Sequence, residues 1–295
     1  MIMMLTARPP FSLSAVVRSH GWVRLAPFAE DEVSGGLTYV GQPAPGRVAQ
    51  LHIQETAGGV RVEVDGQLSE AEGAEVARQV TWMLDLDQEF STFYALARQE
   101  PKLKYVAEKA RGRILRSPTL FEDTVKTILT TNTSWAGTIR MAHALVSQFG
   151  PPHPADPTRH AFPTPDRLAV ADEETLRSAA GLGYRAPYVL ELARSVASGG
   201  LDLEGFMTTE LPTPELRRRL LAIKGVGQYA AANLLMLLGR YDFIPVDSWA
   251  LKLVSHEWYG GEPVERAEVE AAFERWGAWK GLAYWFWDWS YASDA

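Results

Sequence analysis

Cysteine is absent from the 295-residue chain. Its absence excludes disulfide bonds, thiolate catalysis and every zinc or iron–sulfur site that depends on cysteine ligands. The six histidines are scattered along the sequence, and no two of them have the spacing of a metal-binding helix. We therefore expect neither a catalytic transition metal nor an iron–sulfur cluster, and no cofactor that the protein requires.

Long apolar runs are also missing, because no stretch approaches the roughly 20 apolar residues that a membrane-spanning helix needs. The segment Met1–Pro10 lacks the basic start and the apolar core of a signal peptide. Apolar residues make up 46% of the chain and charged residues 22%, which is typical of globular proteins. We expect a cytoplasmic monomer that does not associate with membranes and that, if bacterial, associates with the nucleoid.

The chain also lacks an excess of basic residues, since its formal net charge is −7. Residues 1–100 contain 7 basic and 13 acidic residues, a net charge of −6, whereas residues 101–295 contain 22 and 23, a net charge of −1. The basic runs at 102–116 and 217–219 are typical of solvated faces. Backbone N–H groups can nevertheless bind phosphates where positive charges are few, so the charge does not exclude a nucleic-acid partner.

The beginning of the chain has the patterns of a mixed α and β structure. Apolar and polar residues alternate over Val60–Val64, and the Gly58-Gly59 pair at their start predicts a β-hairpin. A few residues later, Ser69 and Glu72 form a capping-box pattern, which predicts the start of a helix.

Strand patterns stop near residue 90, and apolar residues then recur at helical spacing. Ser117-Pro118 predicts a helix start with serine as the cap. The proline-rich stretch that follows Gly150 and extends to Pro165 is predicted to be a loop. The predicted fold class is thus an α+β N-terminal domain at 1–100 followed by an all-α region at 101–295. Helices are predicted over about 135–149, 172–180, 186–198, 248–258 and 266–276. A further helix is predicted to begin at Thr213, the one after it to end at Gly239, and an aromatic helix to form the C-terminus.

Two predicted helices joined by Gly-Val-Gly form the most specific motif of the chain. The glycines permit a tight turn and a close approach of another backbone, and the N–H groups that begin the second helix can bind a phosphate. A plain helix–turn–helix corner is the alternative. Three backbone carbonyls of the turn are candidates for holding a monovalent cation: those of Leu221, Ile223 and Val226. The predicted DNA contacts are Lys224, Gly225, Val226, Gly227 and Gln228.

Asp247 follows Gly227 by 20 positions and directly precedes a predicted helix. The ordinary role of such an aspartate is to cap the helix. The helix dipole favours an ionised carboxylate at that end, so a capping role and a chemical role are compatible.

The hairpin, the Pro245-Val246-Asp247 segment and their spacing resemble the helix-hairpin-helix glycosylase superfamily of DNA-repair enzymes. Gly181–Val189 is similar to the corresponding segment of 8-oxoguanine DNA glycosylase. The resemblance covers roughly residues 100–290. It implies a TATA-binding-protein-like N-terminal domain, as in that family and in 3-methyladenine DNA glycosylase II.

The resemblance also implies roles for individual residues. Double-stranded DNA with a damaged base becomes the expected partner, and Asp247 the carboxylate that stabilises the oxocarbenium-like sugar while the N-glycosidic bond breaks. A base-flipping enzyme must fill or prop open the gap in the duplex. The residues implied for that task are Asn132, Tyr184 and Arg185. Those implied for the base pocket are Tyr229, Asn233, Tyr284 and Trp285.

Where bifunctional relatives carry a nucleophilic lysine, this chain has Tyr229, which cannot form a Schiff base. We therefore expect base release without strand cleavage, with Lys224 and Lys252 as minor candidates for an amine role. Electron-rich aromatic rings favour a cationic alkylated purine such as 3-methyladenine. The alternatives are an 8-oxoguanine-type glycosylase, which the Tyr184-Arg185 pair supports, and a hairpin module that binds DNA without chemistry.

Overall fold

The computed structural model describes residues 1–31 and 35–290. Contacts divide the chain into two compact units, each built from two separate segments. Unit 1 comprises Met1–Gln88 and Arg113–Thr209, and unit 2 comprises Glu89–Gly112 and Glu210–Ala295. The sequence-based boundary at residue 100 does not coincide with these units, because the chain passes from one to the other three times. None of the described helices is long and apolar enough to cross a membrane.

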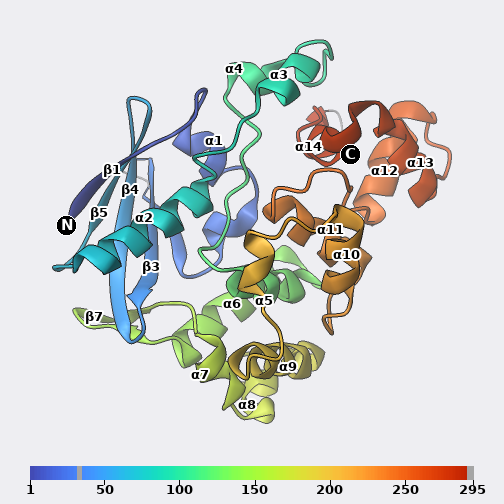
Figure 1. Ribbon diagram of the computed structural model, residues 1–295. Coiled ribbons are helices and arrows are strands. Elements are labelled where there is room, and N and C mark those ends of the chain that lie inside the picture. Colours follow the sequence, from blue (N-terminus) through green and yellow to red (C-terminus); the bar gives the residue numbers. More distant parts are fainter. Residues whose placement is uncertain (32–34, 291–295) are drawn as a thin grey trace. The chain divides into compact units, whose positions relative to one another are not determined.

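Unit 1 contains a five-stranded antiparallel sheet of order β1-β5-β4-β3-β2. The predicted hairpin is confirmed, since β4 and β5 flank Gly58, whose φ is +80°. Helix α2 crosses the sheet (Figure 1), and the predicted capping box is present, with Ser69 N–H donating to the Glu72 carboxylate at 2.8 Å. The elements are β1 (Ile2–Thr6), β2 (Phe28–Asp31), β3 (Gly36–Ala44), β4 (Arg47–Thr56), β5 (Gly59–Val64) and α2 (Glu70–Leu84).

The rest of unit 1 is mostly helical. The expectation that no strand follows residue 90 is wrong, because a short pair of strands, β6 and β7, forms within the proline-rich stretch. The side chains of β7 are largely exposed. The sequence therefore shows no alternation of apolar and polar residues that would have predicted this pair of strands. The elements are α1 (Leu13–Val17), η1 (Gly21–Arg24), α5 (Leu120–Thr130), α6 (Trp135–Phe149), β6 (Pro152–His153), β7 (Asp156–His160), α7 (Pro165–Ala169), α8 (Glu173–Ser178), η2 (Gly183–Arg185), α9 (Ala186–Ala197) and η3 (Glu204–Met207).

The predicted start of α5 at Ser117-Pro118 is also wrong. The cap is Thr119, whose hydroxyl accepts the Glu122 N–H at 3.2 Å. The Glu204 carboxylate accepts the two N–H groups before that of Glu122, from Leu120 at 2.8 Å and Phe121 at 2.9 Å. Long-range acceptors of this kind satisfy the helix end and fix where it begins.

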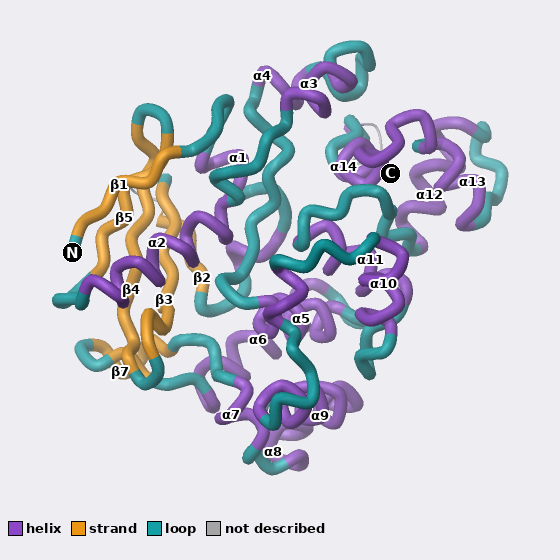
Figure 2. Tube along the Cα trace, in the orientation of Figure 1, coloured by secondary structure: helices purple, strands orange, loops and turns teal. Residues whose placement is uncertain are grey.

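The described part of unit 2 consists of helices and loops (Figure 2). The helix predicted over 248–258 has those bounds, whereas the one predicted to end at 276 stops at Ala272 and continues as a 3-10 turn. The elements are α3 (Ser91–Ala97), α4 (Tyr105–Glu108), α10 (Thr213–Leu221), α11 (Gln228–Leu237), α12 (Ser248–Trp258), α13 (Arg266–Ala272), η4 (Glu274–Trp279) and α14 (Lys280–Trp285).

Candidate active site

The turn between α10 and α11 is tight and internally bonded. The Ile223 N–H donates to the Leu220 carbonyl at 3.1 Å, and the Val226 N–H donates to the Ile223 carbonyl at 3.0 Å. The side chains of Ile223 and Val226 are buried, which anchors the turn to the helices. Gly225 has φ +89°, a conformation that costs an L-residue roughly 1–2 kcal/mol. The Gly-Val-Gly segment thus forms the hairpin that the sequence predicts.

Gly227 leaves the start of α11 open. It is the N-cap residue, no side chain caps the helix, and a Cβ built on Gly227 would meet nothing within 4 Å. The first backbone bond of the helix runs from the Ala231 N–H to the Gly227 carbonyl at 2.9 Å. The N–H groups of Gln228, Tyr229 and Ala230 precede that bond and have no acceptor within the helix. They are arranged as an anion-binding site requires.

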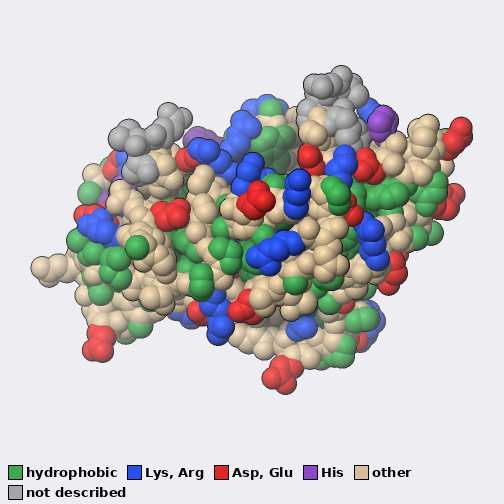
Figure 3. All heavy atoms as spheres, turned by 90° about the horizontal axis from the view of Figure 1, so that it is seen from above, with side chains coloured by type: hydrophobic (Ala, Val, Ile, Leu, Met, Phe, Trp, Pro, Cys, Tyr) green, Lys and Arg blue, Asp and Glu red, His purple; other side chains and the backbone are tan. Residues whose placement is uncertain are grey.

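Arg217 is the basic residue of α10 that lies beside this helix start. Its guanidinium donates to the side-chain oxygen of Gln228 and lies 5.0 Å from the centre of the Phe243 ring. Its neighbours Arg218 and Arg219 instead pair with Glu215, at 2.7 and 3.1 Å. Elsewhere, basic and acidic side chains are interspersed over the face that Figure 3 presents. Positive charge is therefore supplied locally, with Lys224 also exposed on the turn.

The carbonyl groups proposed to hold a monovalent cation belong to the same turn. The Ile223 carbonyl already accepts one N–H, which leaves one lone pair for a cation. Among residues 1–31 and 35–290, no group of three histidine or carboxylate side chains is placed to bind a metal ion. The backbone carbonyls remain the candidate cation ligands of the turn.

Asp247 caps α12 as the sequence predicts, with its Oδ1 accepting the Ala250 N–H at 2.8 Å. The side chain is half-buried and lines a hollow of about 260 Å³. The cap bond fixes the carboxylate at the edge of this hollow. The hollow is lined by Tyr229, Pro245, Asp247, Trp249, Leu253, Tyr284, Trp285 and Trp289.

Two tyrosines line the hollow with this carboxylate. Burial raises the pKa of Tyr284 well above its ordinary value, and the negative charge of Asp247 adds to the effect. Burial likewise raises the pKa of Tyr229, again with a contribution from Asp247. Both phenols therefore stay protonated at neutral pH and can donate hydrogen bonds to a ligand.

Three of the four residues predicted for the base pocket line the hollow, and one does not. Asn233, one turn after Tyr229 on α11, donates its side-chain N–H to the Tyr229 carbonyl at 3.1 Å and is not part of the lining. Trp249 also lines the hollow but was not among the residues predicted for the base pocket. Its side chain is 48% exposed at the first turn of α12. Its position two residues after Asp247 was the available signal. The Lys252 ammonium lies 5.5 Å from the centre of the Trp249 ring.

The other C-terminal tryptophans contact one another or neighbouring rings, and of these Trp276 and Trp287 are buried whereas Trp258 is 38% exposed. Trp258 and Trp287 have ring centroids 5.1 Å apart, and Trp276 and Trp287 meet edge to face at 5.3 Å. Trp279 stacks on Tyr241 with 5.6 Å between centroids. The prediction that only a minority of the C-terminal tryptophans line a pocket is consistent with this packing.

The three residues predicted to act at the opened duplex lie together in unit 1. Asn132 is exposed on the turn between α5 and α6, and Tyr184 is 44% exposed. Arg185 is only 6% exposed, because its guanidinium donates to the carbonyls of Thr131 and Asn132. In this structure the guanidinium of Arg185 is thus bonded to the backbone of the α5–α6 turn.

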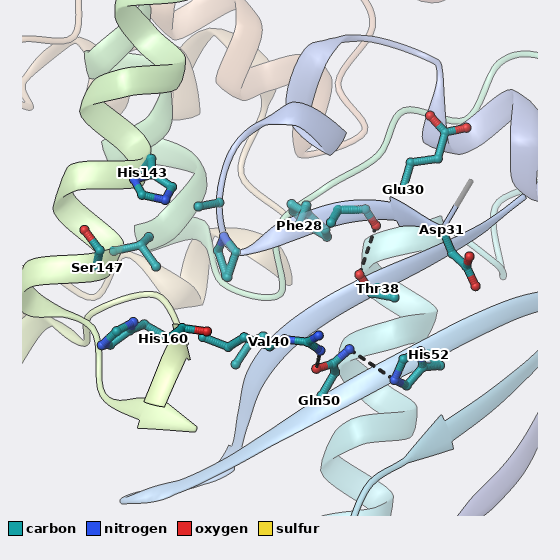
Figure 4. Close-up of a pocket in the computed structure, with 16 residues that line it drawn as sticks. Phe28, Glu30, Asp31, Thr38, Val40, Gln50, His52, His143, Ser147 and His160 are labelled. Carbon is teal, nitrogen blue, oxygen red and sulfur yellow. Dashed lines mark hydrogen bonds between the residues drawn. The ribbon is translucent and has the colours of Figure 1, made fainter. Parts of the chain in front are cut away.

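Unit 1 has a larger hollow of about 540 Å³, shown in Figure 4. His143 and Ser147 reach it from α6 and His160 from β7, and the Gln50 amide lies 3.1 Å from the His52 ring nitrogen. None of the hydrogen bonds drawn in the figure joins His143, Ser147 or His160 to another lining residue. This hollow does not supply a catalytic arrangement comparable to that around Asp247.

Residues 125–278 match the HhH-GPD superfamily of base excision DNA repair proteins, and the chain belongs to this family. It is 27% identical over 180 residues to "DNA-3-methyladenine glycosylase" of Bacillus subtilis, covering 60% of this chain and 59% of that protein. It is 25% identical over 223 residues to "Probable N-glycosylase/DNA lyase" of Methanothermobacter thermautotrophicus, covering 68% and 69%. The match to the Bacillus protein thus spans less than two thirds of that protein's length.

Solved structures show the same fold. The 3-methyladenine DNA-glycosylase from Archaeoglobus fulgidus superposes with a TM-score of 0.76 at 22% identity, over 97% of both chains. The Clostridium acetobutylicum 8-oxoguanine glycosylase/lyase in complex with double-stranded DNA superposes with a TM-score of 0.75 at 20% identity, over 100% of this chain and 98% of that one. At these identities the likeness concerns the fold.

Proposed function

We propose that this protein is a monofunctional DNA glycosylase that releases a damaged purine from double-stranded DNA. One observation carries the proposal. The half-buried Asp247 carboxylate lines an aromatic hollow, in a chain whose family repairs DNA by base excision. In the same unit, the α10–α11 turn offers free N–H groups to a phosphate.

Asp247 acts on the sugar of the extruded nucleotide. As the N-glycosidic bond stretches, positive charge develops on the sugar, and an adjacent fixed carboxylate stabilises it. The carboxylate can also orient a water molecule that attacks the sugar carbon. Because the cap bond from Ala250 holds the group, little reorganisation is needed during the reaction. The base leaves, an abasic site remains, and no cofactor takes part.

Strand cleavage is not part of the proposed reaction. It would require an amine nucleophile, and the position where relatives place a lysine is the phenol of Tyr229. Of the nearby lysines, Lys252 is engaged with the Trp249 ring, and Lys224 is exposed on the hairpin turn. We expect borohydride to trap no covalent complex with DNA. Efficient trapping would show that one of these lysines forms a Schiff base.

The favoured substrate is an alkylated purine with a positive charge. Such a base already has a weakened glycosidic bond and leaves as a neutral molecule, so it needs no proton from the enzyme. The two phenols of the hollow have raised pKa values and are poor proton donors to a leaving base at neutral pH. Aromatic rings such as Trp285 also attract cationic bases.

An 8-oxoguanine lesion is the second candidate. The Tyr184-Arg185 segment favours it. An uncharged oxidised purine benefits from a proton donor more than an alkylated one does. The composition of the hollow around Asp247 therefore ranks it below the alkylated purines.

A panel of duplexes that each carry one defined lesion tests the proposal. Each duplex is incubated with the protein and then analysed with and without alkali, which cleaves abasic sites and so separates base release from strand nicking. We expect product only after alkali, and most of it from 3-methyladenine or 7-methylguanine. Fastest release from 8-oxoguanine duplexes would replace the favoured substrate. Binding without base release from any lesion would leave a DNA-binding module without chemistry.

A further inference from the structure

The turn between α5 and α6 holds an exposed asparagine in an unfavourable backbone conformation. Asn132 has φ +46°, in the left-handed region, where asparagine is tolerated but still disfavoured. The turn is short, because α5 ends at Thr130 and Ser134 already caps α6 by accepting the Gly137 N–H at 3.2 Å. A neighbouring group that bonds to the carbonyls of this turn would hold the conformation in place.

Arg185 is that group. Its Nε donates to the Thr131 carbonyl at 3.1 Å, and its Nη2 donates to the carbonyls of Thr131 and, at 3.1 Å, Asn132. The Thr131 carbonyl also accepts the Tyr184 hydroxyl at 3.2 Å. The remaining nitrogen, Nη1, donates to the Leu182 carbonyl at 3.5 Å. The charge is thus shared among backbone carbonyls in a 6%-exposed position.

The same guanidinium also holds Tyr184. Its central carbon lies 4.4 Å from the centre of the Tyr184 ring, and the ring meets Tyr188 edge to face at 6.1 Å. Arg185 therefore contacts both residues whose side chains remain exposed, Asn132 at its backbone carbonyl and Tyr184 at its ring. A lysine could not replace it, because only the planar fork of arginine reaches two carbonyls while stacking on a ring.

We propose that Arg185 is a positioning residue that fixes Asn132 and Tyr184 as one preorganised wedge for the opened duplex. This inference rests on the proposed glycosylase function and changes the role of one residue within it. Arg185 does not read the base left unpaired in the opposite strand. It holds the turn through its bonds to the carbonyls of Thr131 and Asn132, and the exposed side chains of Asn132 and Tyr184 contact the DNA.

Two variants and a matched control test the proposal. Arg185→Gln removes the charge and the fork, and Arg185→Lys retains the charge alone. Arg194→Gln is the control, because Arg194 is an exposed arginine of α9 that also donates to a carbonyl, that of Ala169 at 3.1 Å. Unfolding by urea is measured first, so that folded variants are compared.

Hydrogen exchange of the free protein gives a readout that does not depend on activity. The Thr131 N–H, which donates to the Ile128 carbonyl at 3.2 Å, should exchange at least about tenfold faster in Arg185→Gln and be unchanged in Arg194→Gln. Unchanged exchange in Arg185→Gln would overturn the proposal even if the protein is a glycosylase. Absence of base release by the wild type, with the exchange result intact, would overturn only the proposed function.

Binding to a duplex with an abasic-site analogue separates positioning from reading. Arg185→Gln should weaken binding about tenfold to the same extent for all four opposite bases, and Arg185→Lys should restore little of it. In a background that carries both Asn132→Ala and Tyr184→Ala, the same change should add less than a factor of two, because Arg185 acts through those two side chains. A loss confined to one opposite base would show instead that Arg185 reads that base.

Discussion

Two aspartates near the starts of helices, Asp123 in unit 1 and Asp247 in unit 2, have opposite surroundings. Asp123 is fully buried, accepts hydrogen bonds from the Trp22 indole at 2.7 Å and the Ser117 N–H at 3.0 Å, and leaves its second oxygen without a partner. Burial raises its pKa to about 7. Asp247 is half-buried, accepts a hydrogen bond from the Ala250 N–H, and lines a hollow.

The contrast shows that the most perturbed acid need not be the functional one. Perturbed groups often mark active sites, but a buried structural network perturbs them too. Asp123 lies next to Glu122 and Lys126, which form a completely buried ion pair at 2.6 Å. The Asp123 side chain itself is 0% exposed, so a substrate does not contact it. Asp247 is useful because it is fixed and yet accessible, so its charge can act on a ligand.

Removal of one partner of the buried pair should have the largest effect on stability. Lys126→Met leaves the Glu122 carboxylate buried without its cation, with the Tyr39 hydroxyl donating to it at 2.7 Å. We expect a loss of about 3–5 kcal/mol in the free energy of unfolding, measured by urea titration. Lys252→Met, which removes an exposed lysine, should lose less than about 1 kcal/mol. Equal losses in the two variants would refute the contrast between the regions.

The pH dependence of stability should reveal Asp123 and a histidine that opposes it. The unfolded chain loses the Asp123 proton near pH 4 and the folded protein near pH 7, so this group makes stability fall as pH rises between them. Burial lowers the pKa of His20 to about 4, so this group makes stability rise from about pH 4 to 6.5. The two contributions nearly cancel in the wild type.

Asp123→Asn should therefore uncover the histidine. Its stability should rise between pH 4.5 and 6.5 by on the order of 2–3 kcal/mol more than that of the wild type, in urea titrations at fixed pH values. His20→Gln should show the reverse slope. Parallel curves for Asp123→Asn and wild type would mean that the carboxyl does not titrate in this range.

The two glycines of the hairpin give a smaller, separable pair of effects. Gly225→Ala should cost about 1–2 kcal/mol of stability, since its φ is +89°. Gly227→Ser should keep stability within a few tenths of a kcal/mol, because serine is a good N-cap. Its hydroxyl would occupy the N–H groups that a phosphate uses, so DNA binding should weaken about tenfold at every sequence, as measured by fluorescence anisotropy. A sequence-dependent loss would speak against a phosphate contact.

The sequence predicted the parts of the molecule that depend on local rules. The Ser69 capping box, the α12 bounds and the Asp247 cap follow from residue preferences at helix ends. Ser117 broke the same rule because its backbone N–H donates to Asp123 and its hydroxyl accepts from Lys126, so Thr119 became the cap. Such long-range partners are not visible in a local pattern.

The site residues divide in the same way. The capping position of Asp247 followed from the local pattern before α12, and its chemical role from the family resemblance, whereas neither predicted the direction of the Arg185 side chain. Which aromatic residues line the hollow also depends on packing: Trp249 and Trp289 do, and Trp287 lies in the core. Asn233 faces the backbone of its own helix.

Replacement of the functional carboxylate should hardly change stability. Asp247→Asn keeps an oxygen for the Ala250 N–H, and asparagine caps helices as well as aspartate does, so the free energy of unfolding should stay within about 0.5 kcal/mol. Asp247→Ala loses the cap and should cost about 1 kcal/mol. A large loss in Asp247→Asn by urea titration would indicate that the charge stabilises the fold.

The central claim is that the charge of Asp247 acts on the sugar of an extruded nucleotide. Single-turnover base release from the best lesion duplex, compared among wild type, Asp247→Asn and Asp172→Asn, tests it most directly. Asp172 caps α8 with the same bond, to the Thr175 N–H at 2.9 Å, outside the hollow, and serves as the matched control. We predict a loss of at least about 100-fold for Asp247→Asn with DNA binding retained, and no change for Asp172→Asn. Equal rates in wild type and Asp247→Asn would contradict the account.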